Sequence, residues 1–225
     1  MTNRWTKNWI VALGLAFLST CARASGAADA VALPVPALDA TPPAAAGQQQ
    51  TVVLSGGCFW GVQAVFQHVK GVKSAVSGYA GGSAETAKYD LVSNGDTGHA
   101  ESVMVTFDPA EVTYGQLLRV FFSVAHDPTE LNRQGPDEGT QYRSAVFFTN
   151  PDQKRVTEAY IAQLERAKLL HGHIVTAVGP LVKFYPAEAY HQDYARLHPR
   201  SPYIVVNDAP KVANLRALFP GLYRE

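Results

Sequence analysis

The sequence predicts an α+β fold, in which helices pack on a β-sheet. Residues 101–107 alternate in the manner of a strand with one buried face. Residues 62–69 place apolar side chains at i, i+3, i+4 and i+7, as on one face of a helix. Strand-like and helix-like segments mix without the strict alternation of βαβ units, which favours an α+β fold.

The first predicted strand, residues 51–55, ends at two glycines, Gly56 and Gly57. The helical pattern of residues 62–69 begins shortly afterwards. Cys58 is therefore expected at a strand-to-helix junction, at or just before the N-terminus of the helix.

A capping box is predicted after the strand of residues 101–107. Thr113 and Gln116 have the spacing of the box, and Val112 and Leu117 are placed for a hydrophobic staple. These signals predict a helix that runs to about residue 124.

The C-terminal half is predicted to contain three more strands and two more helices. Strands are expected over 144–149, 174–179 and 181–185, and a short helix over 187–197. Asn150, followed by Pro151, caps another helix, because Pro is favoured in the first turn. The apolar side of that helix consists of Val156, Tyr160, Leu164 and Ala167.

Two long segments, residues 78–101 and 126–144, are rich in Gly, Asp, Tyr and His. Long loops of this kind in a compact domain usually carry function. Both are therefore candidate active-site loops.

The N-terminus predicts an exported protein. Basic residues precede an apolar run at 9–18, and Ala22-Arg23-Ala24 fits a cleavage site, so residues 1–24 read as a secretory signal peptide. Alternatively, Cys21 is the acylated cysteine of a membrane-anchored lipoprotein. The expected location is the periplasm in either case.

The remaining chain divides into a linker and one domain. Residues 25–50 are dominated by Ala and Pro and contain no aromatic side chain, which predicts a flexible linker. Residues 51–225 have the length of a single domain. Lys and Arg together number 19, as do Asp and Glu, so nothing indicates binding to nucleic acid.

Cys58 is the first candidate for chemistry. A buried structural thiol is the alternative, because free cysteines are among the most buried residues. A helix N-terminus, however, lowers the pKa of a thiol and favours the nucleophilic thiolate. Phe59 and Trp60 either belong to the core or wall a pocket for an apolar group such as a methyl.

Further candidates are a carboxyl group and several hydroxyl groups. Glu101 begins a strand on the same face as buried positions, and partial burial would raise its pKa as a general acid requires; an exposed strand-end glutamate is the alternative. Tyr89, Tyr142 and Asp137 lie in the two polar loops. The seven histidines lack the spacing of a zinc site, so no metal is expected.

Four motifs resemble those of the A-class peptide methionine sulfoxide reductases. They are GGCFWG, GDTGHAE, HDPTELNRQGPDEGTQYRS and YHQDY, in this order along residues 51–225. The resemblance implies an α+β two-layer sandwich with a ferredoxin-like core and long active-site loops. It also implies reduction of the S epimer of methionine sulfoxide, free or in oxidised proteins, without a metal or organic cofactor.

The resemblance assigns roles by motif. Cys58 is implied as the nucleophile that attacks sulfur, and Glu101 as the donor of a proton to the sulfoxide oxygen. Tyr89 and Tyr142 are implied to hydrogen-bond that oxygen. Residues that bind the substrate are Phe59, Trp60 and, as a hydrogen-bonding group, Asp137. Attack on the sulfoxide would leave a sulfenic acid on Cys58.

The chain departs from many members of that family because no cysteine follows Cys58. The sulfenic acid is therefore expected to need an external thiol, supplied by thioredoxin, glutaredoxin or a small molecule. Nothing in the sequence indicates an obligate partner, so a monomer is expected.

Two other classes of function remain open from the residues alone. Cys58 paired with a histidine, which Asp137 or Asn207 would orient, would suit a thiol hydrolase or acyltransferase. A binding module could instead use Phe59 and Trp60 to recognise methionine-rich exported proteins.

Overall fold

The computed structural model describes residue 1 and residues 30–40 and 47–225. The predicted signal peptide beyond Met1, and residues 25–29 and 41–46 of the predicted linker, lie outside the described residues. Among the described residues, no helix is long and apolar enough to cross a membrane.

The centre of the molecule is a six-stranded sheet with the order β7-β6-β1-β3-β2-β8. Neighbouring strands are antiparallel except for the parallel pair β6 and β7. The strands are β1 (Gln50–Ser55), β2 (Val72–Ala80), β3 (Ala100–Phe107), β6 (Ala145–Phe148), β7 (Ala177–Pro180) and β8 (Phe184–Pro186). A separate two-stranded sheet pairs β4 (Arg133–Gln134) with β5 (Asp137–Glu138).

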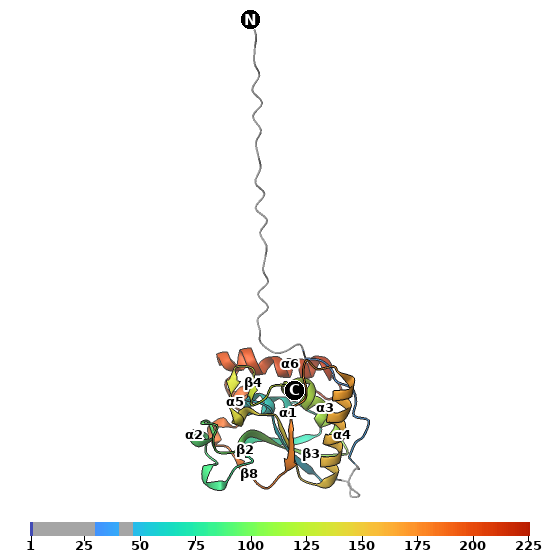
Figure 1. Cartoon of the computed structure of the whole chain (residues 1–225), viewed down its shortest axis with the longest axis vertical. Coiled ribbons are helices and arrows are strands. Elements are labelled where there is room, and N and C mark those ends of the chain that lie inside the picture. Colours follow the sequence, from blue (N-terminus) through green and yellow to red (C-terminus); the bar gives the residue numbers. More distant parts are fainter. Residues whose placement is uncertain (2–29, 41–46) are drawn as a thin grey trace.

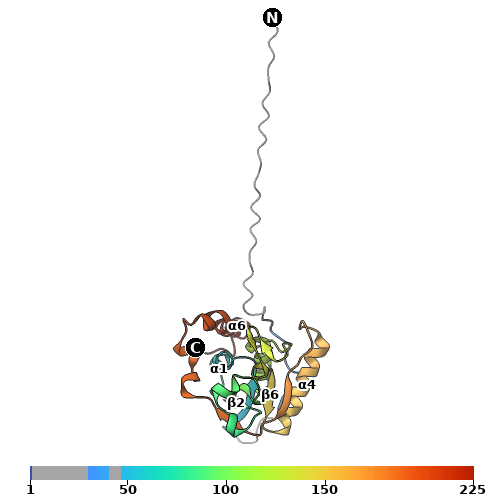
Figure 2. The same ribbon diagram turned by 60° about the vertical axis from the view of Figure 1, so that its left-hand side comes forward.

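Helices complete a mixed α/β fold, as the sequence predicts in outline. They are α1 (Phe59–Gln67), α2 (Tyr89–Val92), α3 (Tyr114–Val120), α4 (Pro151–Ala167), α5 (Tyr194–Leu197) and α6 (Ala209–Leu218). Short 3₁₀ or π turns are η1 (Ala84–Thr86), η2 (Phe121–Ala125), η3 (Thr140–Tyr142), η4 (Ala189–His191) and η5 (Ile204–Asp208). In Figure 1, α1 lies between the sheet and α6, and α4 runs along one side; Figure 2 gives a second view of the same layers.

The predicted caps form as their sequences indicate. The Thr113 side chain accepts a hydrogen bond from the Gln116 N–H, and the Gln116 side chain bonds back to the Thr113 N–H. The Asn150 side chain accepts from the Gln153 N–H at 2.9 Å and so begins α4.

Two predicted helices differ in extent. The helix expected to reach residue 124 changes from α3 into the π turn η2 at Phe121. The segment 187–197 is not one helix but η4 and α5, because Asp193 between them adopts a left-handed conformation with φ 57°.

Composition predicts a flexible linker over residues 25–50, but residues 30–40 pack against the domain. The Leu33 side chain is 1% exposed, its N–H donates to the Ser123 hydroxyl at 3.1 Å, and its carbonyl accepts from Arg119 at 2.6 Å. The Tyr160 hydroxyl donates to the Pro34 carbonyl at 2.8 Å. We call residues 30–40 the strap, because an apolar anchor and hydrogen-bonded backbone fix them across η2, α3 and α4.

Candidate active site

The backbone that carries Cys58 is shaped by the two glycines before it. Gly57 has φ +84°, and a Cβ added there would lie 2.5 Å from the Cβ of Gln134. A Cβ at Gly56 would lie 2.7 Å from the His126 ring. The glycines therefore let residues 126–134 approach the turn closely, and Cys58 becomes the N-cap of α1 as the sequence predicts.

The pKa of the Cys58 thiol is raised well above its usual value. Burial is the main cause, and Glu101 and Asp208, when they are ionised, raise it further. The Trp60 N–H at the helix end and the Lys211 ammonium lower it without reversing the balance. The sequence-based expectation of a thiol with a lowered pKa is therefore wrong for the free protein, because burial outweighs the helix N-terminus.

Glu101 lies directly beside Cys58. Its side chain is 2% exposed on β3, and Oε2 accepts a hydrogen bond from the Phe59 N–H at 3.0 Å. Burial, with help from the charges of Asp137 and Asp208, raises the pKa of Glu101 to about 8, although the Phe59 N–H opposes the shift. The carboxyl group is thus largely protonated at neutral pH, and it is more deeply buried than a strand-end position suggests.

Phe59 and Trp60 occupy different surroundings. Phe59 is 1% exposed, and its ring lies 5.0 Å from that of His191, between centroids. Trp60 is half-buried and stacks on Tyr194 at 3.8 Å, and its indole N–H donates to His191 Nδ1 at 3.2 Å. His191 therefore orients both aromatic side chains next to Cys58.

Tyr89 and Tyr142 reach the site from separate loops. Tyr89 begins α2, where its backbone N–H donates to Glu188, and its ring lies 4.3 Å from that of His191. Tyr142 ends η3. The pKa of each hydroxyl is raised, first by burial and then by the charge of Glu101, so both remain hydrogen-bond donors.

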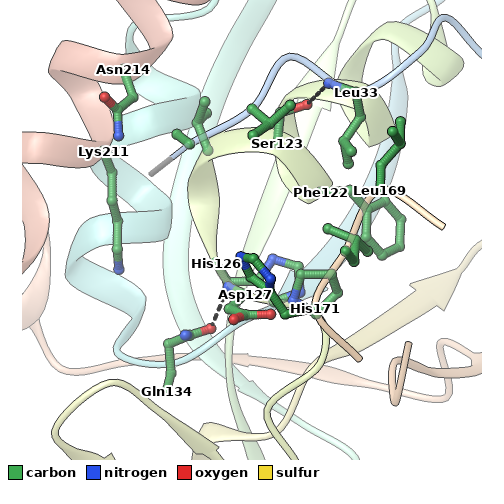
Figure 3. Close-up of a pocket in the computed structure, with 15 residues that line it drawn as sticks. Leu33, Phe122, Ser123, His126, Asp127, Gln134, Leu169, His171, Lys211 and Asn214 are labelled. Atoms are coloured by element: carbon green, nitrogen blue, oxygen red, sulfur yellow. Dashed lines mark hydrogen bonds between the residues drawn. The ribbon is translucent and has the colours of Figure 1, made fainter. Parts of the chain in front are cut away.

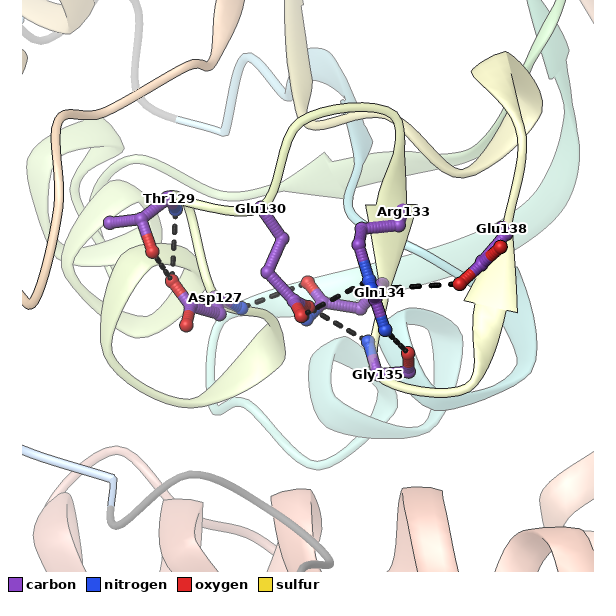
Figure 4. Close-up of polar contacts among 7 residues, drawn as sticks. All are labelled: Asp127, Thr129, Glu130, Arg133, Gln134, Gly135 and Glu138. Carbon is purple, nitrogen blue, oxygen red and sulfur yellow. Dashed lines mark hydrogen bonds and ion pairs between the residues drawn. The ribbon is translucent and has the colours of Figure 1, made fainter.

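The loop that precedes Asp137 has its own network of hydrogen bonds, which Figure 4 shows around Glu130 and Gln134. The Glu130 carboxylate accepts from the side chain of Gln134 and from the Gly135 N–H at 2.8 Å, and Gln134 accepts from the Asp127 N–H at 2.9 Å. Asp137 accepts a hydrogen bond from the Tyr203 hydroxyl. Burial raises the pKa of Asp137, whereas the hydrogen bond from Tyr203 lowers it.

Three residues near the site carry no signal in the sequence: Tyr203, Asp208 and Lys211. They belong to the C-terminal segment, which contains no recognisable motif. The charges of Glu101, Asp137 and Asp208 act on one another or on Cys58, so this segment contributes to the electrostatics of the site.

No histidine is hydrogen-bonded to Cys58 among the residues that the structure describes. His126 uses both ring nitrogens, on the Phe121 carbonyl at 3.2 Å and the Ser144 hydroxyl at 2.7 Å. Its pKa is lowered to about 3 by burial, so it is neutral. His126 therefore has no free ring nitrogen to act as a general base for Cys58.

Comparison with known proteins identifies the family. A family model described as "Peptide methionine sulfoxide reductase" matches residues 50–220. The chain belongs to the peptide methionine sulfoxide reductase family.

Within residues 30–40 and 47–225, no group of three or more His, Cys, Asp or Glu side chains is placed to hold a metal ion.

Proteins similar to this peptide methionine sulfoxide reductase align with most of its chain. A Mesorhizobium japonicum protein named peptide methionine sulfoxide reductase MsrA 2 is 61% identical, over 80% of this chain and 93% of the relative. A Synechocystis protein of the same name is 49% identical, over 82% and 86%. The solved structure of methionine sulfoxide reductase A of Corynebacterium diphtheriae has a TM-score of 0.60 and 34% identity, over 78% and 90%.

Proposed function

We propose that the protein reduces the S epimer of methionine sulfoxide to methionine, using Cys58 as nucleophile and Glu101 as acid. One observation carries the proposal. A buried carboxyl group with a pKa of about 8 accepts a hydrogen bond from the residue that follows the thiol. Sulfoxide reduction needs this combination, because the oxygen leaves sulfur only after it has gained a proton.

The protons balance in the first half-reaction. Glu101 gives its proton to the sulfoxide oxygen while the sulfur of Cys58 bonds to the sulfoxide sulfur. The proton of the thiol replaces the one that Glu101 gave. The sulfoxide S–O bond then breaks and the oxygen, as a hydroxyl group, becomes bonded to the sulfur of Cys58. The transient bond between the two sulfurs breaks with its electron pair going to the substrate sulfur. The products are methionine, reduced by two electrons, and a sulfenic acid on Cys58, oxidised by two.

The remaining site residues bind and orient the sulfoxide. The Tyr89 and Tyr142 hydroxyls donate hydrogen bonds to its oxygen. Phe59 and Trp60 receive its methyl group, and Asp137 bonds the substrate through its carboxyl group. Separate sites for the oxygen and the methyl group, with Cys58 attacking sulfur from a third direction, favour one epimer over the other, which we propose to be the S epimer.

The sulfenic acid is returned to the thiol by an external thiol such as thioredoxin, glutaredoxin or a small molecule. The chain supports this proposal because it has no cysteine after Cys58. No metal or organic cofactor is required. The substrate is methionine sulfoxide, free or within oxidised proteins, and the enzyme acts as a monomer.

The proposed location is outside the cytoplasm, in the periplasm, after removal of residues 1–24 or with Cys21 as a lipid anchor. We also propose that β1, β2, β3 and β6, with α1 and α3, form the ferredoxin-like core of a two-layer sandwich. The supporting observation is their order β6-β1-β3-β2 with antiparallel neighbours. The catalytic domain comprises residues 51–225 together with the strap.

The test is a single turnover without reductant. The chain from Ser25 onward, which keeps the strap, is mixed with the separate epimers of a methyl sulfoxide. One equivalent of sulfide from the S epimer alone, with Cys58 trapped as a sulfenic acid by dimedone, is expected. No product and an intact thiol would reject the reductase and favour the binding module. A thioester would favour the hydrolase.

A further inference from the structure

The buried Asp208 and the partly buried Lys211 form an ion pair close to Cys58. Lys211 Nζ lies 3.2 Å from Asp208 Oδ1, and the side chains are 14% and 0% exposed. Asp208 is the last residue of η5, and Lys211 lies three residues later in the first turn of α6. Both helical segments pack against α1.

The pair rests on the first turn of α1. A Cβ added at Gly61 would lie 2.1 Å from Asp208 Oδ1 and 2.8 Å from Lys211 Nζ. Glycine is therefore the residue that admits both groups at this position, three residues after Cys58. Figure 3 shows the Lys211 side chain extending from α6 along α1, at the edge of a cavity of about 130 Å³.

Stability alone does not explain this pair. Asp208 Oδ2 is buried and has no hydrogen-bond partner in the described part of the chain. A buried ion pair is weak evidence for stability, because removing two charges from water offsets their attraction. A half-satisfied carboxylate beside a nucleophile is more typical of a site that uses the charge.

The surroundings of Cys58 are strongly acidic. Glu101 reaches it from β3, Asp137 lies across the site on β5, and Asp208 lies on η5. The hydroxyls of Tyr89, Tyr142 and Tyr203 face the same group and carry no charge. The Lys211 ammonium, which contacts Asp208 and lies against Gly61, lowers the pKa of Asp208 and Asp137 and, to a smaller extent, that of Cys58.

We propose that Lys211 is a positioning residue whose ammonium, held by Asp208 against Gly61, stabilises the thiolate of Cys58. The inference rests on the proposed function of Cys58 as nucleophile. Without this cation, a thiolate would form among carboxyl groups with no opposite charge to offset their repulsion.

The same cation serves the second half-reaction. An external thiolate attacks the sulfur of the Cys58 sulfenic acid, the S–O bond breaks, and the oxygen leaves as water after gaining a proton. The product is a mixed disulfide. The attacking thiolate brings a negative charge into the acidic site, and Lys211 attracts it.

The experiment measures how the rate of Cys58 alkylation by iodoacetamide depends on pH. Lys211→Met is expected to move the profile to higher pH and to slow alkylation at pH 8 by about tenfold, the change that one pKa unit produces. Lys211→Arg keeps the charge and should restore the rate to within about threefold. Arg216→Gln, which removes a cation from the exposed end of the same helix, is the matched control and should leave the profile unchanged.

The Asp208→Asn variant tests whether Asp208 holds Lys211 in place or acts on Cys58 only through its own negative charge. If Asp208 holds Lys211 in place, its profile moves to higher pH, as with Lys211→Met. A shift to lower pH would mean that Asp208 acts only as a negative charge and would overturn its holding role. A Lys211→Met profile that coincides with that of the unmodified protein would overturn the role of Lys211.

Lys211→Gln provides a second neutral variant in case Lys211→Met does not fold, and the same outcomes apply to it. Alkylation needs no sulfoxide, so its result is independent of the single-turnover test. An unchanged alkylation profile would leave the reductase proposal intact. An inactive protein with a shifted profile would leave the role of Lys211 intact.

Discussion

The buried polar groups at the start of α1 and those beside α4 differ in how completely they are hydrogen-bonded. Near Cys58, His191 Nε2 and Asp208 Oδ2 are buried without a hydrogen-bond partner in the described chain. Beside α4, the hydroxyls of Tyr114 and Thr157 bond to each other at 2.7 Å. There the Gln153 side chain also bonds to the carbonyl of Thr51 at 2.9 Å.

The difference separates groups kept reactive from groups that stabilise the fold. Around Cys58, burial without full pairing displaces pKa values and leaves protons and charges available for chemistry. Beside α4, each hydrogen bond replaces one with water and contributes about 1 kcal/mol to stability. Substitutions around Cys58 should therefore alter the reaction rate, and substitutions beside α4 should alter the free energy of unfolding.

The largest expected effect follows from Glu101→Gln. Glutamine keeps an oxygen for the Phe59 N–H but has no acidic proton to give. The single-turnover rate should fall by about 10²- to 10⁴-fold. The rate of the unmodified protein should also fall as pH rises through about 8, where Glu101 loses its proton, and this decline should vanish in the variant. A higher KM with an unchanged chemical step would instead assign Glu101 to binding.

The strap provides the contrasting test, because it lies away from the chemistry. Leu33→Ala empties a position that is 1% exposed, and the free energy of unfolding should fall by about 2–4 kcal/mol. Activity at low temperature should not change. Val35→Ala, at a position that is 64% exposed in the same strap, is the control and should have little effect on urea unfolding. Equal effects of the two changes would mean that the strap does not stabilise the domain.

Glu101→Gln should also stabilise the fold, in a pH-dependent way. The pKa of Glu101 is about 8 in the folded protein against an ordinary 4.5, so the folded state retains a proton that the unfolded state loses. Stability of the unmodified protein therefore falls as pH rises from 4.5 to 8. The variant lacks this loss and should gain about 1–4 kcal/mol over the unmodified protein at pH 9, but little at pH 4. An equal gain at both pH values would contradict the buried acid.

Local signals predicted the elements whose causes are local. The Thr113 capping box, the Asn150 cap and the alternating strand around Glu101 each depend on residues a few positions apart. The strand β2 was not predicted, because its sequence VKSAVSGYA has small and polar residues. Its conformation is fixed by pairing with β3 on one side and β8 on the other.

The site was predictable to the same degree. Cys58 stands out through its glycines and aromatic neighbours, and the expected loops place Tyr89, Tyr142 and Asp137 within electrostatic reach of Glu101. Lys211 was not predicted from the sequence, because apolar and polar residues alternate around the whole of α6 without forming one apolar face. The proposed role of Lys211 depends instead on how α6 packs against α1. The thiol pKa was mispredicted for a related reason: burial is a property of the whole fold.

The smallest expected effect lies at the cap of α4. Asn150→Ala removes the acceptor for the Gln153 N–H, which should lower the free energy of unfolding by about 1 kcal/mol. Glu158→Gln is the control within the same helix, because the exposed pair of Glu158 with Lys154, 3.8 Å apart, should contribute less than about 0.5 kcal/mol. Both variants should keep the single-turnover rate of the unmodified protein. A loss of rate in Asn150→Ala at equal foldedness would show that α4 and the start of α1 are coupled, and the division between reactive and stabilising regions would then fail.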